Sequence, residues 1–310
     1  MSGRWSGPAL LAAAGMVVGC GADRTALVGR WDVSFTDGGE RYPGWLEVRT
    51  EGDSLAGRFQ GRFGHATPIA GIRSEGKRFS FSWPDEGDPS APATVLEGEI
   101  QAGDRLVGTM RGGRDSVSFD GHRAPALAPR DSVVFGEVID LLGDGLAGWQ
   151  LRDPAGPNGW TLADGELINT PPSGDLFTTR RFTDFRLSLE VNVPPGGNSG
   201  VYLRGRHEVQ VQDDAGRDPH SRRMGGVYGQ LTPTALPALP AGEWQRLEIE
   251  LVGRRVIVAL NGVTVIDRAE IPGITGGALD SEEAAPGPIM LQGDHTGVRY
   301  RRIVLRPAED

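Results

Sequence analysis

Polar side chains that could bind or activate a hydroxylated molecule are concentrated between Pro194 and Asp213. After a turn signal at Pro194 to Gly197, apolar residues recur at every second position, a spacing typical of a β-strand. One face of this strand would carry valine and leucine, and the other would carry Asn198, Tyr202, Arg204, Arg206, Glu208, Gln210 and Gln212. A continuous row of amide, guanidinium and carboxylate groups on one face predicts the floor of a binding groove. The plainer alternative is the solvated face of an antiparallel sheet.

The composition indicates a chain with enough residues for two packed β-domains. The 310 residues fit two domains of ordinary size, and 47 glycines and 22 prolines suit short strands joined by many turns. The net charge of −9 argues against nucleic acid and against an anionic membrane surface as partners.

Residues 20–123 predict a small accessory domain, an antiparallel barrel or sandwich. Turn residues separate eight expected strands at a spacing of roughly 8–12 residues, as in small all-β folds. The expected strands are Gly29–Thr36, Gly44–Thr50, Ser54–Arg62, Thr67–Ile72, Arg78–Trp83, Thr94–Gln101, Arg105–Arg111 and Ser116–Arg123. No grouping of catalytic residue types is evident in this domain, where His65 and His122 each stand alone. Residues 124–132, rich in Ala and Pro, predict a linker.

Residues 133–310 predict a second all-β domain, a two-sheet jelly roll. The stretch from Phe185 to Val193 alternates apolar and polar residues throughout, and no amphipathic helix of useful length is evident. Asp164-Gly165 and Asn261-Gly262 are signals for two-residue hairpin turns. Many antiparallel strands in one domain favour two stacked sheets.

The N-terminus has the pattern of an export signal. Arg4 precedes a short apolar run from Pro8 to Val18, which is too short to span a bilayer. Val17-Val18-Gly19-Cys20 resembles the lipobox of bacterial lipoproteins, in which the cysteine is lipidated. The resemblance implies a signal peptide over residues 1–19 and a protein held by lipid at the bacterial cell envelope, facing periplasm or exterior. The alternative is an ordinary secretory signal with an incidental cysteine.

Ordered short motifs in the second domain resemble one known family, the 3-keto-disaccharide hydrolase domain. They include Asp144 to Trp149, Gly197-Asn198-Ser199-Gly200, Glu208-Val209-Gln210, Val227-Tyr228-Gly229, Gly242-Glu243-Trp244 and Leu291-Gln292 with His295. The resemblance covers about Val133–Leu305. It implies a concanavalin A-like sandwich with a sugar groove, because the family is similar in fold to lectins and glucanases of that type.

The resemblance also implies the chemistry. A ketone at C3 of a sugar acidifies the C2 proton, so that a base can remove it and the C1 substituent can leave by elimination before water adds. On this basis Glu208 is a candidate base or metal ligand, His295 a candidate base, acid or metal ligand, and Arg204 a group that polarises the ketone. Substrate-binding candidates are Asn198, Tyr202, Gln210, Tyr228 and Gln292. A divalent cation held by Glu208 and His295 is a further implication.

Two departures from the family pattern bear on the site. Gly293 separates Gln292 from Asp294 and His295, which predicts either a bulge or a displaced imidazole. His207 stands where the family more often has an aromatic residue, and its parity points it away from Glu208.

Alternative functions remain open at this point. One is a non-catalytic sugar-binding lipoprotein, and another is a structural envelope protein. A third is a glycosidase with two carboxylates, in which Glu208 pairs with Glu190, Asp175 or Asp294. The sequence lacks the paired acidic residues that jelly-roll glucanases carry on one strand.

Overall fold

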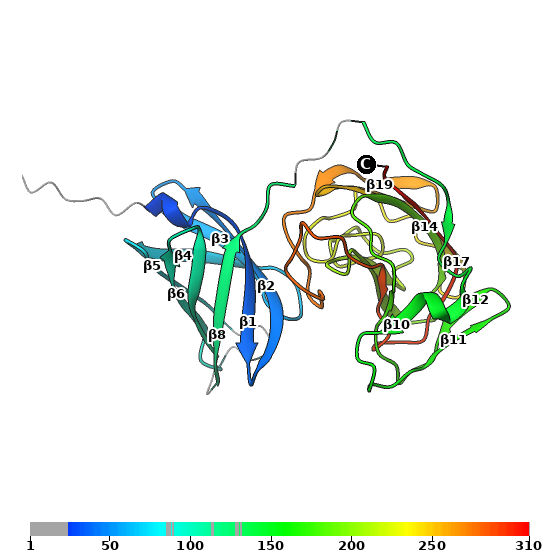
Figure 1. Cartoon of the computed structure of the whole chain (residues 1–310), viewed down its shortest axis with the longest axis horizontal. Helices are drawn as coiled ribbons and strands as arrows, with labels where there is room; N and C mark the ends of the chain where they lie inside the picture. The colour runs from blue at the N-terminus through cyan, green and yellow to red at the C-terminus, as the bar shows by residue number, and fades with distance from the viewer. Residues whose placement is uncertain are drawn as a thin grey trace, which may run out of the picture.

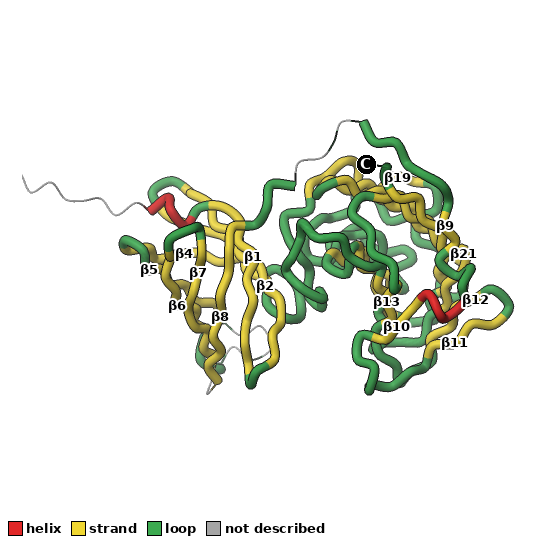
Figure 2. Tube along the Cα trace, in the orientation of Figure 1, coloured by secondary structure: helices red, strands yellow, loops and turns green. Residues whose placement is uncertain are grey.

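The computed structural model describes residues 24–84, 88, 90–112, 115–127, 130 and 132–309. It contains two β-rich bodies side by side, a barrel drawn in blue and cyan and a larger sandwich drawn in green to red (Figure 1). Strands and loops make up nearly all of both bodies (Figure 2). Cys20 and the expected signal peptide lie outside the described residues. Within the described ranges, no helix has the length and apolar character needed to cross a bilayer.

The first body is a closed barrel, which decides between the two predicted architectures. Its strands pair in chain order from β1 to β8, and β8 pairs back with β1. The inward side chains form a core that contains Trp31, Phe35, Leu46 and Phe119. A short 3-10 helix, η1 (Arg24–Leu27), precedes the strands β1 (Gly29–Asp37), β2 (Glu40–Glu51), β3 (Ser54–Gln60), β4 (Thr67–Glu75), β5 (Arg78–Trp83), β6 (Thr94–Gln101), β7 (Arg105–Gly112) and β8 (Asp115–Arg123). The predicted strands agree closely with these bounds.

The second body is the predicted sandwich of two antiparallel sheets. A five-stranded sheet has the order β10 (Trp149–Leu151), β13 (Leu176–Thr178), β20 (Met290–Leu291), β15 (Asn198–Leu203) and β16 (His207–Gln212). The larger sheet has the order β11 (Trp160–Ala163), β12 (Glu166–Asn169), β21 (Arg299–Pro307), β14 (Phe185–Asn192), β17 (Trp244–Val252), β18 (Arg255–Leu260) and β19 (Val263–Glu270), with β9 (Ile139–Asp140) paired to β21. The 3-10 helix η2 (Gly145–Gly148) precedes β10.

The apolar faces predicted from alternation form the core between these sheets. Val201, Leu203, Val209 and Val211 from the small sheet are fully buried together with Phe185, Leu187, Leu189 and Val191 from the large one. Both predicted turns are present, because Asp164-Gly165 and Asn261-Gly262 have positive φ at both positions, as a type I′ hairpin requires.

The barrel packs against the loop of residues 273–285 of the sandwich. Trp45 of β2 is fully buried and forms a small apolar cluster with Ile274 and Ala278. The indole lies directly on Gly273, where any side chain would overlap the ring. Arg62 and Gly277 join the bodies through a backbone hydrogen bond of 2.9 Å. The loops beside β2 are therefore held in contact with the sandwich (Figure 1).

A buried group of charges lies at the same interface. Asp32 of β1 is 1 % exposed, and no described residue donates a hydrogen bond to either of its carboxyl oxygens. Burial, then the adjacent carboxyl of Glu283, raises the pKa of Asp32 to about 8. Glu283 itself is fully buried and is ion-paired with Arg254. Because Arg254 is paired with Glu283, Asp32 is the carboxyl of this neighbouring pair that holds a proton at neutral pH.

This arrangement predicts that Asp32→Asn stabilises the protein at alkaline pH. The folded state holds a proton on Asp32 up to about pH 8, whereas the unfolded chain releases it near pH 4. The free energy of unfolding of the wild type should therefore decrease as pH rises through this window. In Asp32→Asn it should decrease less over the same range. Scanning calorimetry between pH 5 and 9 measures the effect, with the exposed turn residue Asp53 changed to Asn as a control. Equal pH slopes for the wild type and Asp32→Asn would contradict the assignment.

Candidate functional site

The polar stretch found in the sequence folds into a hairpin rather than one continuous strand. β15 and β16 are antiparallel, and Tyr202 lies opposite Glu208 while Gly200 lies opposite Gln210. Three turn residues, 204–206, separate the paired Leu203 and His207, so residues of the same parity lie opposite each other and the side chains of both strands alternate as predicted. Asn198, Tyr202, Glu208 and Gln210 all line one cavity on the sheet face that is turned away from the larger sheet.

The structure corrects the role expected for Arg204. This residue is at the tip of the hairpin, where Arg204 and Gly205 both have positive φ and the strand alternation is interrupted. Its guanidinium is buried and donates hydrogen bonds to the carbonyl oxygens of Glu283 and Gly253. Arg204 therefore does not line the cavity and holds loops in place instead of contacting a ligand there.

Glu208 is a buried carboxyl at the base of the cavity. It is 4 % exposed, and burial raises its pKa to about 8. Gly200 leaves room for it, because a side chain at that position would overlap the carboxyl. The Tyr202 hydroxyl is 3.0 Å from Glu208 Oε2 and 2.9 Å from the carbonyl oxygen of Gly276. One hydroxyl proton serves one acceptor, so both contacts are satisfied together when Glu208 carries a proton and donates it to Tyr202.

His295 lies in the same cavity as Glu208 despite the additional glycine. Gly293 lies two residues beyond the end of β20 and donates a backbone hydrogen bond of 3.1 Å to Asp175. A side chain at Gly293 would overlap the carbonyl of Gly174, so the chain can pass here only without a Cβ. His295 is half exposed, and its Nδ1 is 2.6 Å from Asp294 Oδ1. Asp294 raises the pKa of His295 and orients the ring, leaving Nε2 for another partner.

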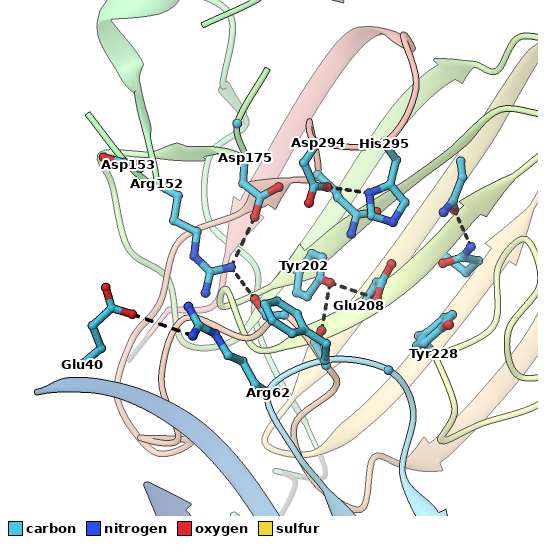
Figure 3. A pocket seen from close by; sticks show the side chains of 18 of the residues that line it. Glu40, Arg62, Arg152, Asp153, Asp175, Tyr202, Glu208, Tyr228, Asp294 and His295 are labelled. Carbon is cyan, nitrogen blue, oxygen red and sulfur yellow. Dashed lines mark hydrogen bonds and ion pairs between the residues drawn. The ribbon is translucent and has the colours of Figure 1, made fainter. Parts of the chain in front are cut away.

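Sequence reasoning missed Arg152, which lines the cavity beside Asp175. The guanidinium of Arg152 is 3.3 Å from Asp175 and donates to the carbonyl oxygens of Gly277 and Ala278 at 2.7 and 3.1 Å. Burial raises the pKa of Asp175. Figure 3 shows Arg152, Asp175, the Asp294–His295 pair and Glu208 around one space. Nothing in the spacing of the sequence singled out Arg152.

Two amide oxygens in the cavity are free to accept hydrogen bonds. Gln210 donates from Nε2 to Asn198 and Gln212 at 2.8 and 2.9 Å, which orients its Oε1 away from them. Oε1 of Gln210 and Oε1 of Gln292 are buried, and neither receives a hydrogen bond from any described residue. Buried acceptors without donors are costly, so they favour a ligand rich in hydroxyl groups.

The complete cavity has a volume of about 650 Å³, which is within the range of small-molecule sites. All substrate-binding candidates from the sequence line it, namely Asn198, Tyr202, Gln210, Tyr228 and Gln292. Four residues of the barrel, Glu40, Arg62, Phe63 and Gly64, complete its wall. No pattern in the sequence indicates that the barrel takes part in the cavity.

A metal ion does not fit the side chains that the structure brings together. Across the described residues, no group of three or more His, Cys, Asp or Glu side chains could hold a metal ion. Glu208 and His295 therefore lack further side-chain ligands for the divalent cation considered from the sequence.

Two other expectations concern residues near the site. Glu190, one of the carboxylates considered as a partner for Glu208, belongs to β14 in the larger sheet and is paired with Arg301 and Arg302. Asp175 and Asp294, by contrast, do share the cavity with Glu208. His207 is fully buried with Nδ1 3.2 Å from the carbonyl oxygen of Gly273, in agreement with its predicted orientation away from the cavity.

A β-sandwich whose sheet face forms a polar cavity around a buried carboxyl, an imidazole and free amide acceptors fits the class of carbohydrate-acting proteins. Residues 137–306 match the family described as the 3-keto-alpha-glucoside-1,2-lyase-like domain, and the chain belongs to this family. The match confirms the family resemblance of the second domain and leaves the barrel outside it.

The chain is also similar to individual proteins. A 3-keto-disaccharide hydrolase of Bacteroides thetaiotaomicron is 23 % identical, and the alignment covers 36 % of this chain and 50 % of that protein. The chain thus spans about half the length of this curated relative. A crystal structure from Parabacteroides distasonis, named as a candidate glycosyl hydrolase, is 26 % identical with a TM-score of 0.49 and covers 58 % of this chain and 92 % of that one. A carbohydrate-binding module of Bacillus subtilis is 13 % identical with a TM-score of 0.31 and covers 51 % of this chain and 95 % of that one.

Proposed function

We propose that the protein cleaves glycosides whose sugar ring carries a ketone at C3. The observation that carries this proposal is the pairing, in one cavity, of a buried carboxyl whose pKa is about 8 with an imidazole bound to a carboxylate. The first group holds a proton at neutral pH, and the second can accept one at Nε2. Such a pair suits an elimination, which needs a base on one bond and an acid on the neighbouring bond.

In the first half of the reaction, Nε2 of His295 removes the C2 proton, and the electron pair forms the enolate of the C3 ketone. The enolate then expels the C1 substituent while Glu208 gives its proton to the departing oxygen. The products are a 2-hydroxy-glycal with its C3 ketone and the free aglycone. Arg152 replaces Arg204 as the candidate guanidinium for the enolate oxygen, because Arg152 lines the cavity.

In the second half, the same two groups act in reverse. Glu208 is now a carboxylate and takes a proton from a water molecule that adds to C1, while His295 returns its proton to C2. The net result is hydrolysis, with both residues restored. We assign Glu208 the role of acid rather than base because its raised pKa favours the protonated carboxyl at neutral pH.

The experiment that tests the proposal is incubation of the purified protein with a 3-keto-glucoside and with the same glucoside unoxidised. Formation of the 2-hydroxy-glycal or of free 3-keto-glucose from the first compound alone is the expected result. Cleavage of the unoxidised glucoside instead would favour a two-carboxylate glycosidase, for which Asp175 and Asp294 provide partners in the cavity of Glu208. Sugar binding without turnover of either compound would favour the lectin-like alternative.

We also propose that the protein is anchored at the bacterial cell envelope through lipidated Cys20. The support for this proposal is the lipobox-like sequence Val17-Val18-Gly19-Cys20. Metabolic labelling with a palmitate analogue, compared between the wild type and Cys20→Ala, tests it.

A further inference from the structure

The loop between β3 and β4 of the barrel, residues 61–66, forms part of the cavity wall opposite the sandwich. Arg62, Phe63 and Gly64 line the same cavity as Glu208 and His295, although the barrel is outside the family match. Phe63 is 70 % exposed. A single exposed aromatic ring is unremarkable by itself, but this ring borders a cavity whose other walls carry hydrogen-bonding groups for a sugar.

The loop is held in one position from both sides. The fully buried Gln60 donates from Nε2 to the carbonyl oxygens of Gly61 and Phe63 at 3.0 and 3.3 Å. From the sandwich, Gly277 donates its backbone N–H to the carbonyl of Arg62 at 2.9 Å. The neighbouring Gly276 packs so closely on Gly64 that a side chain there would overlap the carbonyl of Gly64. The loop is therefore a fixed wall rather than a loose cover.

The side chains of the loop are arranged as a recognition surface. The Arg62 guanidinium lies over the rings of Tyr42 and Phe63, at 5.2 and 5.1 Å from their centroids, and 3.8 Å from Glu40. These contacts orient Phe63 while most of its ring remains exposed. Arg62 and Glu40 both line the cavity, and Figure 3 shows them paired with each other at one side of it. An apolar ring next to a charged pair matches a pyranose, which has an apolar C–H face and a rim of hydroxyl groups.

The same loop is connected to Glu208. Gly276 packs on Gly64, and its carbonyl oxygen is one of the two partners of the Tyr202 hydroxyl, the other being Glu208. Phe63 and Glu208 also line one cavity, so a ring bound against the barrel would share that space with the group that protonates the departing oxygen. That position suits the leaving group rather than the sugar that carries the ketone.

We propose that the barrel domain is a specificity element that binds the leaving group as a second pyranose ring, with Phe63 as its stacking platform and Arg62 as its hydroxyl donor. The identification of this second ring as the leaving group rests on the proposed function. The binding of a two-ring sugar by the barrel loop does not depend on it.

The test compares three substrates: a 3-keto-disaccharide, 4-nitrophenyl 3-keto-glucoside and methyl 3-keto-glucoside. Phe63→Ala should lower the ratio of kcat/KM for the disaccharide to kcat/KM for the methyl glucoside at least about tenfold, since only the former presents a second ring. Phe63→Trp should keep the ratio within about threefold of the wild type. Arg62→Met should lower kcat/KM for the disaccharide more than kcat/KM for the 4-nitrophenyl glucoside, because the aryl ring has no hydroxyl groups for Arg62 to bind. Val134→Ala, at an exposed apolar residue of the sandwich, is the matched control.

An unchanged ratio in Phe63→Ala would overturn the proposal, and an equal loss on all three substrates would assign the loop a purely structural role. If both the wild type and Arg62→Met have a higher kcat/KM for the 4-nitrophenyl glucoside than for the disaccharide, the subsite binds aromatic aglycones and the proposal of a second pyranose is wrong. If none of the three compounds is turned over, calorimetry can measure the affinities for the unoxidised disaccharide and for methyl glucoside. The ratio of these two affinities, compared between the wild type and Phe63→Ala, then tests the subsite. Failure of the proposed reaction and failure of the subsite are thereby distinguished.

Discussion

Glu208→Gln is expected to lower kcat for cleavage of a 3-keto-glycoside by roughly 10²–10⁴-fold while making the protein more stable at neutral pH. The loss of rate follows because glutamine has no proton to give to the departing oxygen. Glutamine retains the shape of the carboxylic acid and can still contact Tyr202, so substrate binding should change little. Single-turnover kinetics with a saturating 3-keto-glucoside measure this effect.

The gain in stability follows from the raised pKa. The folded protein holds the Glu208 proton up to about pH 8, whereas the unfolded chain releases it above its ordinary value of 4.5. Stability therefore falls as pH rises through this window, by about 3 kcal/mol at pH 7 if the whole shift is expressed. Glutamine cannot ionise, and the variant should unfold at a temperature several degrees higher than the wild type at pH 8 and at a similar temperature near pH 4.

The two effects of Glu208→Gln have opposite signs, which separates a catalytic role from a structural one. A residue needed only for folding would lose stability and activity together. Calorimetry and kinetics on the same preparations provide the comparison, and Asp213→Asn in the loop after β16 is a suitable control. Full activity in Glu208→Gln would remove this carboxyl from the mechanism.

His295→Asn is expected to reduce cleavage by a similar factor, because asparagine retains a polar group of related size but cannot accept the C2 proton. The exposed position of His295 predicts only a small change in thermal stability. A loss of less than about threefold in kcat would contradict the role of His295 as base.

Asp294→Asn tests how the imidazole is oriented and tuned. Asp294 raises the pKa of His295, so its removal should lower that pKa. A base must be unprotonated to act, so the acid limb of the kcat/KM profile should move to lower pH in the variant while the maximal rate declines. The alkaline limb reflects loss of the Glu208 proton near pH 8, and it should move less than the acid limb, since burial is the largest cause of that raised pKa and the Asp294 charge is a smaller one. An unchanged acid limb would mean that Asp294 does not act through His295.

Local patterns in the sequence were sufficient for the strands and for the faces that they present. Alternation in Phe185–Asn192 and in the hairpin strands assigned core and cavity faces correctly, because burial on one side of a sheet imposes period 2. Asp164-Gly165 and Asn261-Gly262 marked their turns because few other residue pairs adopt positive φ twice in succession.

The errors arose where the chain leaves regular structure. Arg204 follows the alternation in the sequence, but it lies in a three-residue turn, 204–206, outside both faces of the sheet. Arg-Gly is not among the strong turn signals, so the hairpin was interpreted as one strand. The sequence leaves two outcomes open at Gly293, a bulge or a displaced imidazole, and the structure keeps His295 in the cavity because glycine can pack closely against Gly174.

The remaining parts of the site depend on contacts between segments distant in sequence. Arg152 reaches the cavity from the loop after β10, and Arg62 and Phe63 reach it from a different domain. The raised pKa of Glu208 likewise results from burial by neighbours that alternation in β16 alone does not reveal. No periodicity records such contacts, because they follow from how the barrel and the sandwich pack together.

The central claim, that His295 and Glu208 act as base and acid on neighbouring bonds of a 3-keto-glycoside, is tested most directly by proton exchange in D2O. NMR can follow deuterium incorporation at C2 of methyl 3-keto-glucoside, with C4, which is also next to the ketone, as an internal reference for uncatalysed exchange. Glu208→Gln should exchange C2 faster than C4 while releasing little methanol, and His295→Asn should exchange C2 no faster than C4. Rapid C2 exchange in His295→Asn, or its loss in Glu208→Gln alone, would contradict the account.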